Sequence, residues 1–144
     1  MALILIVDDE PSVREILARW IRGAGHEIVE AESAEAALQA MEKQPAAAVF
    51  SDIQMPGHDG LWLTAELRKR YRTTAIVLAT SVSTVAPNVS MQAGVLAYLV
   101  KPFSHESVLR ALETALAWHT DTVGTGPRPE DTPERLRQWL DSLK

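Results

Sequence analysis

Five segments of β-strand length alternate with amphipathic segments along the first 119 residues of this chain. The strand-like segments occupy residues 3–7, 27–31, 46–50, 75–79 and 96–100. After each of them, apolar residues recur at helical spacing, and these helical segments begin near residues 11, 33, 59, 86 and 104. Regular alternation of strands and helices predicts a parallel sheet that is covered by helices on both faces.

The most apolar strands predict the order of the sheet. Unbroken apolar runs at residues 3–7, 46–50 and 75–79 are typical of strands that are buried on both faces, so we expect these three at the centre. Right-handed crossovers leave few arrangements. We therefore predict an α/β fold with a doubly wound five-stranded parallel sheet in the flavodoxin-like order 2-1-3-4-5. Its crevice lies at the carboxyl ends of the first and third strands.

Polar residues follow four of the five predicted strands. Asp8 and Asp9 come directly after the first strand, and Asp52 ends the third. The fourth strand is followed by Thr80 and the fifth by Lys101. Taken singly, the acids could cap helices, the threonine could be a turn hydroxyl and the lysine could be solvated. Their placement at successive strand ends instead favours one shared site.

Three neighbouring carboxylates predict a cation site. Carboxylates that lie close together repel, so at neutral pH they need protons or a cation. A set of oxygen ligands with room for water and phosphate favours Mg²⁺. We expect Asp52 to be a nucleophile that forms an aspartyl phosphate, with Mg²⁺ and Lys101 offsetting the charge of the phosphoryl group.

Charge and composition exclude several other classes of protein. The chain has 144 residues, which suggests one domain, and its net charge of −5 argues against direct binding to nucleic acid. It contains no cysteine, and its four histidines show no metal-ligand spacing. The apolar start is too short for a membrane span and lacks the features of a signal peptide. We therefore expect a cytoplasmic protein without a membrane partner.

At this point the chain resembles the response-regulator receiver domains of two-component signalling, including the chemotaxis-type regulators. Residues 3–119 carry the resemblance. The acidic pair in residues 7–11 and the phosphoacceptor loop in residues 52–60 are similar to the motifs of that family, as is the lysine motif in residues 101–103. Thr80 matches the switch hydroxyl and Tyr98 the switch aromatic residue.

The resemblance implies a phosphorylation-activated switch. In it Asp52 is the phosphoacceptor and binds Mg²⁺ together with Asp9 and the backbone carbonyl of Gln54, while Asp8 acts mainly through a bound water. Thr80 and Lys101 assist the chemistry, and Thr80 with Tyr98 relays the change. The phosphoryl group would come from a histidine kinase or phosphotransfer protein, and the chain would catalyse only its own phosphorylation and dephosphorylation.

The same resemblance implies protein partners for the output. These would be a downstream effector or an output domain, and a dimer could form through the face of the fourth helix, fifth strand and fifth helix. Ser81 and Pro87 depart from common family patterns near that face. Val95 and Leu96 stand where many relatives have polar residues. This apolar pair is explained either by ordinary variation of the core or by an interaction surface.

The composition changes after His119. Residues 120–131 contain Gly124, Gly126 and two prolines and predict a linker. Residues 132–144 predict a short amphipathic helix with one apolar face, formed by Leu136, Trp139, Leu140 and Leu143. We expect this helix to dock near Trp20 or Trp118. The chain fits both a single-domain regulator with a tail and a piece of a longer protein.

Two other functions compete with the receiver. One is a Mg²⁺-dependent phosphatase with an aspartyl nucleophile, which would need an acid two residues after Asp52, where this chain has Gln54. The other is a degenerate receiver that serves only for docking. The complete set of three aspartates, a threonine and a lysine argues against it.

Overall fold

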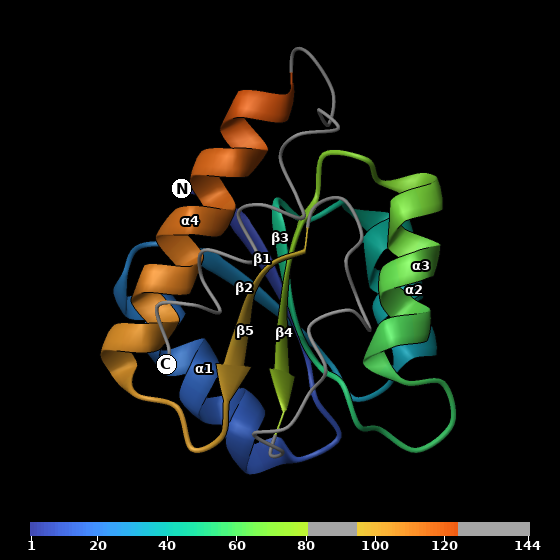
Figure 1. Cartoon of the computed structure of the whole chain (residues 1–144), viewed down its shortest axis with the longest axis horizontal. Helices are drawn as coiled ribbons and strands as arrows, with labels where there is room; N and C mark the ends of the chain where they lie inside the picture. Colours follow the sequence, from blue (N-terminus) through green and yellow to red (C-terminus); the bar gives the residue numbers. More distant parts are fainter. Residues whose placement is uncertain (81–94, 124–144) are drawn as a thin grey trace.

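Five parallel strands form one sheet in the computed structural model, which describes residues 1–80 and 95–123 (Figure 1). Their order is β2-β1-β3-β4-β5, which confirms the predicted flavodoxin-like arrangement. The strands are β1 (Leu3–Val7), β2 (Glu27–Ala31), β3 (Ala48–Asp52), β4 (Ala75–Thr80) and β5 (Val95–Val100). The apolar strands β1, β3 and β4 lie at the centre, as expected.

Helices cover both faces of the sheet. On one face lie α1 (Pro11–Gly23) and α4 (His105–Val123), and on the other lie α2 (Ala34–Lys43) and α3 (Gly60–Arg70) (Figure 1). The helix predicted around residues 86–93 falls outside the described residues, as does the one predicted for 132–144. No helix in the described part of the chain is long and apolar enough to cross a membrane.

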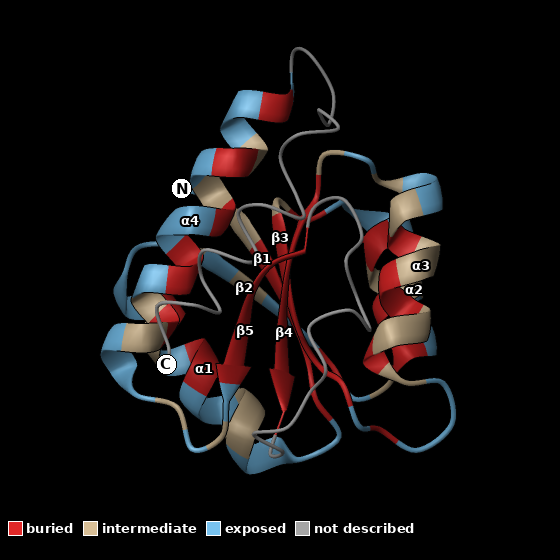
Figure 2. Cartoon of the chain, viewed as in Figure 1, coloured by how far each residue is buried: buried red, intermediate tan, exposed pale blue. Residues whose placement is uncertain are grey.

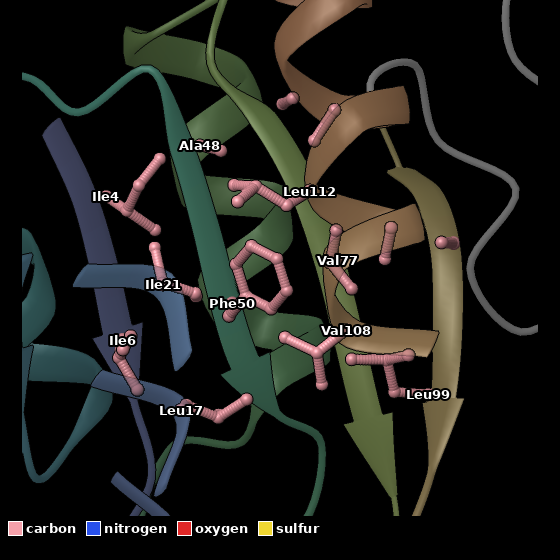
Figure 3. Close-up of a cluster of buried hydrophobic side chains, with 14 of the residues drawn as sticks. Ile4, Ile6, Leu17, Ile21, Ala48, Phe50, Val77, Leu99, Val108 and Leu112 are labelled. Atoms are coloured by element: carbon pink, nitrogen blue, oxygen red, sulfur yellow. The ribbon is translucent and has the colours of Figure 1, made fainter. Parts of the chain in front are cut away.

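The sheet is buried on both sides because its central strands carry apolar residues at successive positions. In β1, Ile4 and Ile6 join the core under α1 and α4, whereas Leu5 and Val7 join the core under α2 and α3. Figure 2 shows the central strands as buried and the helices as buried along one side only. Figure 3 shows Phe50 of β3 among the side chains of the first of these cores.

Side-chain caps start α2, α3 and α4, and that of α4 is the Ser104 hydroxyl, which accepts a hydrogen bond from the Ser107 amide at 3.0 Å. The Ser33 hydroxyl accepts a hydrogen bond from the Ala36 amide at 3.1 Å, which begins α2. The Asp59 carboxylate accepts one from the Trp62 amide at 2.8 Å, which begins α3. The loop that follows Asp52 therefore ends at Asp59, which caps α3.

Two expectations for apolar residues are decided by burial. Val95 and Leu96 are buried in β5, so they belong to the core and not to an interaction surface. Trp118 is also fully buried, between the sheet and α4, so it offers no docking surface for another segment. Trp20 of α1 is only partly buried.

The last helix is longer than the sequence predicted. It continues through Val123, although the linker was expected to start at residue 120. Thr122 is buried, and its hydroxyl donates to the carbonyl of Trp118 at 2.9 Å, one helical turn earlier, so this hydroxyl is not left unpaired there. The polar residues after His119 are therefore compatible with a helix that still packs on the domain.

Candidate functional site

Three charged side chains meet at the carboxyl edge of the sheet. The ammonium of Lys101, just after β5, lies 2.9 Å from Asp8 Oδ2 and 3.3 Å from Asp52 Oδ2. Asp8 follows β1 and Asp52 ends β3, and these two strands are neighbours in the sheet. The structure therefore brings together residues that are far apart in the sequence, as their positions after the strands predicted.

Burial and neighbouring charges shift the pKa values of Asp52 and Lys101. Asp8 is 1% and Asp52 5% exposed. Burial raises the pKa of Asp52 above the ordinary value of 3.8; Lys101 counteracts part of this rise and the charge of Asp8 adds to it. Burial alone would lower the pKa of Lys101, but its hydrogen bond to Asp8 and the charges of Asp52 and Asp8 raise it overall.

Backbone contacts fix the position of Asp52. Its Oδ1 accepts a hydrogen bond from the Gln54 amide at 3.3 Å, and the next residue, Ile53, donates its amide to the Ala79 carbonyl at 2.8 Å. Gly60, the first residue of α3, donates its amide to the Ile53 carbonyl at 2.8 Å. A Cβ on Gly60 would come within 2.9 Å of the Ile53 Cα, so glycine permits this close approach.

Asp8 is held from two sides. Its Oδ1 accepts a hydrogen bond from the Glu10 amide at 2.9 Å, and its backbone carbonyl accepts one from Arg14 of α1 at 2.5 Å. The Arg14 guanidinium also lies 3.4 Å from a carboxylate oxygen of Glu30. The carboxylate of Asp8 is therefore oriented toward Lys101 by the start of α1.

The acidic residues after β1 could hold a cation. Carboxylate oxygens of Asp8, Asp9 and Glu10 all lie within 4.8 Å of one another. Asp52 does not belong to this close group, although it shares Lys101 with Asp8. Glu10 was not among the predicted ligands. Its position directly after Asp8 and Asp9 in the sequence is the signal that could have found it.

The loop after Asp52 lines an open hollow of its own. Residues 53–57 and Asp59 line an open hollow of about 590 Å³. Gly57 adopts a positive φ of 79° there, which allows the loop to turn. Gln54, whose backbone carbonyl was predicted to be a metal ligand, lines this hollow and has an exposed side chain.

The two predicted switch residues are both buried. Thr80, at the end of β4, is 2% exposed, and its backbone carbonyl accepts a hydrogen bond from the Lys101 amide at 2.7 Å. Tyr98 of β5 is 3% exposed and packs in the core under α2 and α3. The side chain of Tyr98 therefore already lies inside the domain in this structure. Ser81 and Pro87 lie outside the described residues.

Comparisons with known proteins identify similar sequences. A family model described as the response regulator receiver domain matches residues 4–113. The response regulator protein FleR of Pseudomonas aeruginosa is 38% identical over 109 residues, which are 75% of this chain and 23% of FleR. The transcriptional regulatory protein AruR of the same organism is 37% identical over 146 residues, covering 97% of this chain and 58% of AruR.

Solved structures show the same similarity. The response regulator TrrA of Thermotoga maritima, in complex with Mg²⁺-BeF, superposes with a TM-score of 0.74 at 34% identity, over 81% of this chain and 100% of that one. The chemotaxis response regulator CheY4 of Vibrio cholerae gives a TM-score of 0.72 at 30% identity, with coverages of 81% and 99%. The chain thus spans whole receivers but only part of the curated relatives FleR and AruR.

Proposed function

Because the chain belongs to the response regulator receiver domains of two-component systems, we propose that it is a switch controlled by phosphorylation of Asp52. The observation that carries this proposal is the ammonium of Lys101, held between the buried carboxylates of Asp8 and Asp52 at the carboxyl edge of the sheet. A buried carboxylate with a positive charge beside it suits the acceptance of a phosphoryl group.

The proposed reaction transfers a phosphoryl group from a phosphohistidine to Asp52. A carboxylate oxygen of Asp52 attacks phosphorus, the phosphorus–nitrogen bond breaks, and the released imidazole nitrogen takes up a proton. Lys101 stabilises the negative charge on the phosphoryl oxygens, since its ammonium already lies at this carboxylate. In dephosphorylation, a water oxygen attacks phosphorus, the bond between phosphorus and the Asp52 oxygen breaks, and inorganic phosphate and a proton leave while Asp52 returns to its carboxylate form.

The donor set fits Mg²⁺. The candidate ligands are carboxylate and carbonyl oxygens alone, which is the chemistry that this ion prefers. Asp9 and Asp52 with the Gln54 carbonyl would hold it, Asp8 would contribute mainly through water, and Glu10 stands close enough to Asp8 and Asp9 to take part. When bound, the ion would neutralise charge on the phosphoryl group. Without it, Lys101 is the cation beside Asp8 and Asp52.

We propose that the chain catalyses only its own phosphorylation and dephosphorylation. A phosphatase that used Asp52 as nucleophile would need a proton donor near the leaving group, and two residues later stands Gln54, which cannot donate in this way. We propose that a histidine kinase or phosphotransfer protein donates the phosphoryl group to this chain. We also propose that the chain acts in the cytoplasm.

The output is proposed to pass through protein contacts. FleR is named as a response regulator and AruR as a transcriptional regulatory protein, and each is longer than the region that matches this chain. With a net charge of −5, this chain is proposed to act on an output domain or downstream protein and to leave any contact with DNA to that partner. A dimer through the region of β5 and α4 is one form that the output could take.

Mass spectrometry tests the phosphoacceptor. Incubation with acetyl phosphate and Mg²⁺ should add one phosphoryl group to the wild-type chain and none to Asp52→Asn. Asp59→Asn is the matched control, because Asp59 belongs to the same loop and asparagine can also cap α3. Chelation with EDTA should abolish labelling. If Asp52→Asn is labelled as well as the control, the assignment of Asp52 is wrong.

A further inference from the structure

An apolar groove lies beside the phosphorylation site, between α1 and the segment that links β5 to α4. Its volume is about 450 Å³, and its apolar wall is formed by Val13, Ile16, Trp20 and Phe103. Trp20 meets the ring of Phe103 edge-on, with the ring centroids 6.4 Å apart. Glu10 and Lys101 line the end of the groove that is nearest to the acidic site.

Part of this apolar wall is open to water. Ile16 is 41% exposed although it lies in the middle of α1, and Val13, Trp20 and Phe103 are only partly buried against the core. The described residues leave this side of α1 uncovered, whereas the opposite side packs on the sheet through Leu17 and Ile21. An apolar surface of this kind is stabilised when another apolar segment covers it.

The remainder of the chain offers such a segment within reach. Residues 124–144 follow α4, which packs on the same face of the sheet as α1. The groove lies near the first turn of α4, and this helix of 19 residues is about 28 Å long. From residue 123, where α4 ends, to residue 132 there are nine residue steps, which span about 30 Å when extended, so residue 132 can return to the level of the groove.

The chemistry of the segment matches that of the groove. Its residues 132–144 carry four large apolar side chains at the spacing of one helical face, Leu136, Trp139, Leu140 and Leu143. An isolated helix of this length is marginal in water and needs a surface to pack against. Its acids and bases are nearly balanced, so charge does not oppose its approach to Glu10 and Lys101.

We propose that residues 132–144 dock in the groove formed by Val13, Ile16, Trp20 and Phe103 of the same chain. Glu10 and Lys101, which line one end of this groove, also belong to the acidic site. Docking would remove the apolar side chains of the groove and of the segment from water. This inference is independent of the phosphorylation chemistry, and its test does not use phosphoryl transfer.

Disulfide trapping tests the docking, because the natural chain contains no cysteine. The full chain with Ile16→Cys and Leu140→Cys should form an intramolecular disulfide at low protein concentration. The control pair is Glu42→Cys with Leu140→Cys, since Glu42 is exposed on α2, on the opposite face. The first pair should close on the order of tenfold faster or more, because docking raises the local concentration of the two thiols.

The products distinguish the alternatives. Equal rates for the two pairs would overturn the proposal, and so would disulfides that form mainly between two copies, which would assign the groove to a second chain. A second measurement follows the indole N–H signal of Trp20 by NMR. It should shift in Leu136→Ser/Leu140→Ser but not in Gln138→Ser, a substitution off the apolar face; an unmoved signal in the double variant would also contradict docking.

Discussion

Lys101 compensates the negative charges of the two buried aspartates of the site. Its ammonium contacts Asp8 and Asp52, which are almost completely excluded from water. Removing one partner of a buried ion pair leaves a charge without compensation, and this costs far more than the loss of an exposed pair. The side chain therefore has a structural part in addition to its proposed part in the chemistry.

Lys101→Ala should lower the free energy of unfolding by on the order of 3 kcal/mol in EDTA, because Asp8 and Asp52 lose their counter-ion. Mg²⁺ should then raise the melting temperature of this variant more than that of the wild type, since the ion replaces the missing charge. Lys69→Ala is the control, because Lys69 pairs with Glu66 at the surface of the molecule. Weaker Mg²⁺ binding by Lys101→Ala would contradict this role.

The raised pKa of Asp52 predicts a pH-dependent effect on stability. With a folded pKa above 3.8, Asp52 binds its proton more tightly in the folded chain than in the unfolded chain. Its contribution to the free energy of unfolding therefore falls as the pH rises from 3.8 through the folded pKa. Asp52→Asn removes this loss, so in EDTA it should melt at a higher temperature than the wild type at pH 7.

Thermal melts between pH 4 and 7 would check this prediction, with Asp59→Asn as the control. The advantage of Asp52→Asn should shrink as the pH falls toward 3.8, where the wild-type carboxyl also becomes protonated in the unfolded chain. An advantage that grows on acidification would show that the charge of Asp52 is not the cause.

At the scale of the elements, the start of α3 is pressed against the end of β3. Gly60 lies so close to the backbone of Asp52 and Ile53 that a side chain has no room. The same loop is held at its other side by His58, which stacks on Trp62 of α3 with ring centroids 3.7 Å apart and pairs with Glu35 of α2. The position of Asp52, the proposed phosphoacceptor, thus depends on how α3 packs.

Gly60→Ala should therefore displace Asp52 and destabilise the fold by about 1–3 kcal/mol, the usual effect of overpacking. Labelling by acetyl phosphate should slow as well. Gly23→Ala is the matched control, because a Cβ at Gly23 meets nothing within 4 Å and alanine favours helix. Melting curves and labelling rates of both variants would check this; equal behaviour of the two would mean that the close approach is unimportant.

Helices and strands were predictable where apolar periodicity was strong. The strand order followed from the apolar runs of β1, β3 and β4. The end of α4 was missed because Thr122 looks like a linker residue, although its hydroxyl satisfies itself within the helix and can be buried. Burial of Trp118 was also missed, because the sequence shows that a residue is apolar but not which neighbours cover it.

At the scale of the molecule, β4 and β5 connect the acidic site with α4. Asp52 pairs with Ala79 in the register of β3 and β4, and Thr80 pairs with Val100 in that of β4 and β5. The Lys101 amide is bonded to the Thr80 carbonyl, so a movement of either residue is transmitted to the other. Ala111 of α4 is buried on the opposite side of the sheet from Tyr98.

A beryllofluoride adduct, which stands in for the phosphoryl group, should therefore shift amide signals of Thr80, Tyr98 and Ala111 in NMR spectra. The reason is that the new acceptor at Asp52 draws the Thr80 hydroxyl and Lys101, and one packed element with two arrangements can carry the change onward. Val29 on the distant edge strand β2 serves as the internal control. Shifts confined to the surroundings of Asp52 would refute this coupling.

The sequence predicted those parts of the site that depend on strand order alone. Residues at strand ends could be placed because parallel strands share one carboxyl edge, which brought Asp8, Asp52 and Lys101 together. Rotamers and exposure could not be placed in this way. The buried position of Tyr98 and the closeness of Glu10 to Asp8 and Asp9 emerge only from packing.

The distance along the chain between Asp8 and Lys101 has a consequence for biosynthesis. The two residues are 93 positions apart, with Asp52 near the middle. During translation, both aspartates are therefore added to the chain well before the lysine that compensates their charge. Incomplete chains that end before β5 contain Asp52 but lack Lys101. We therefore expect the proposed phosphoryl transfer to require a chain that has been synthesised through the last strand of the sheet.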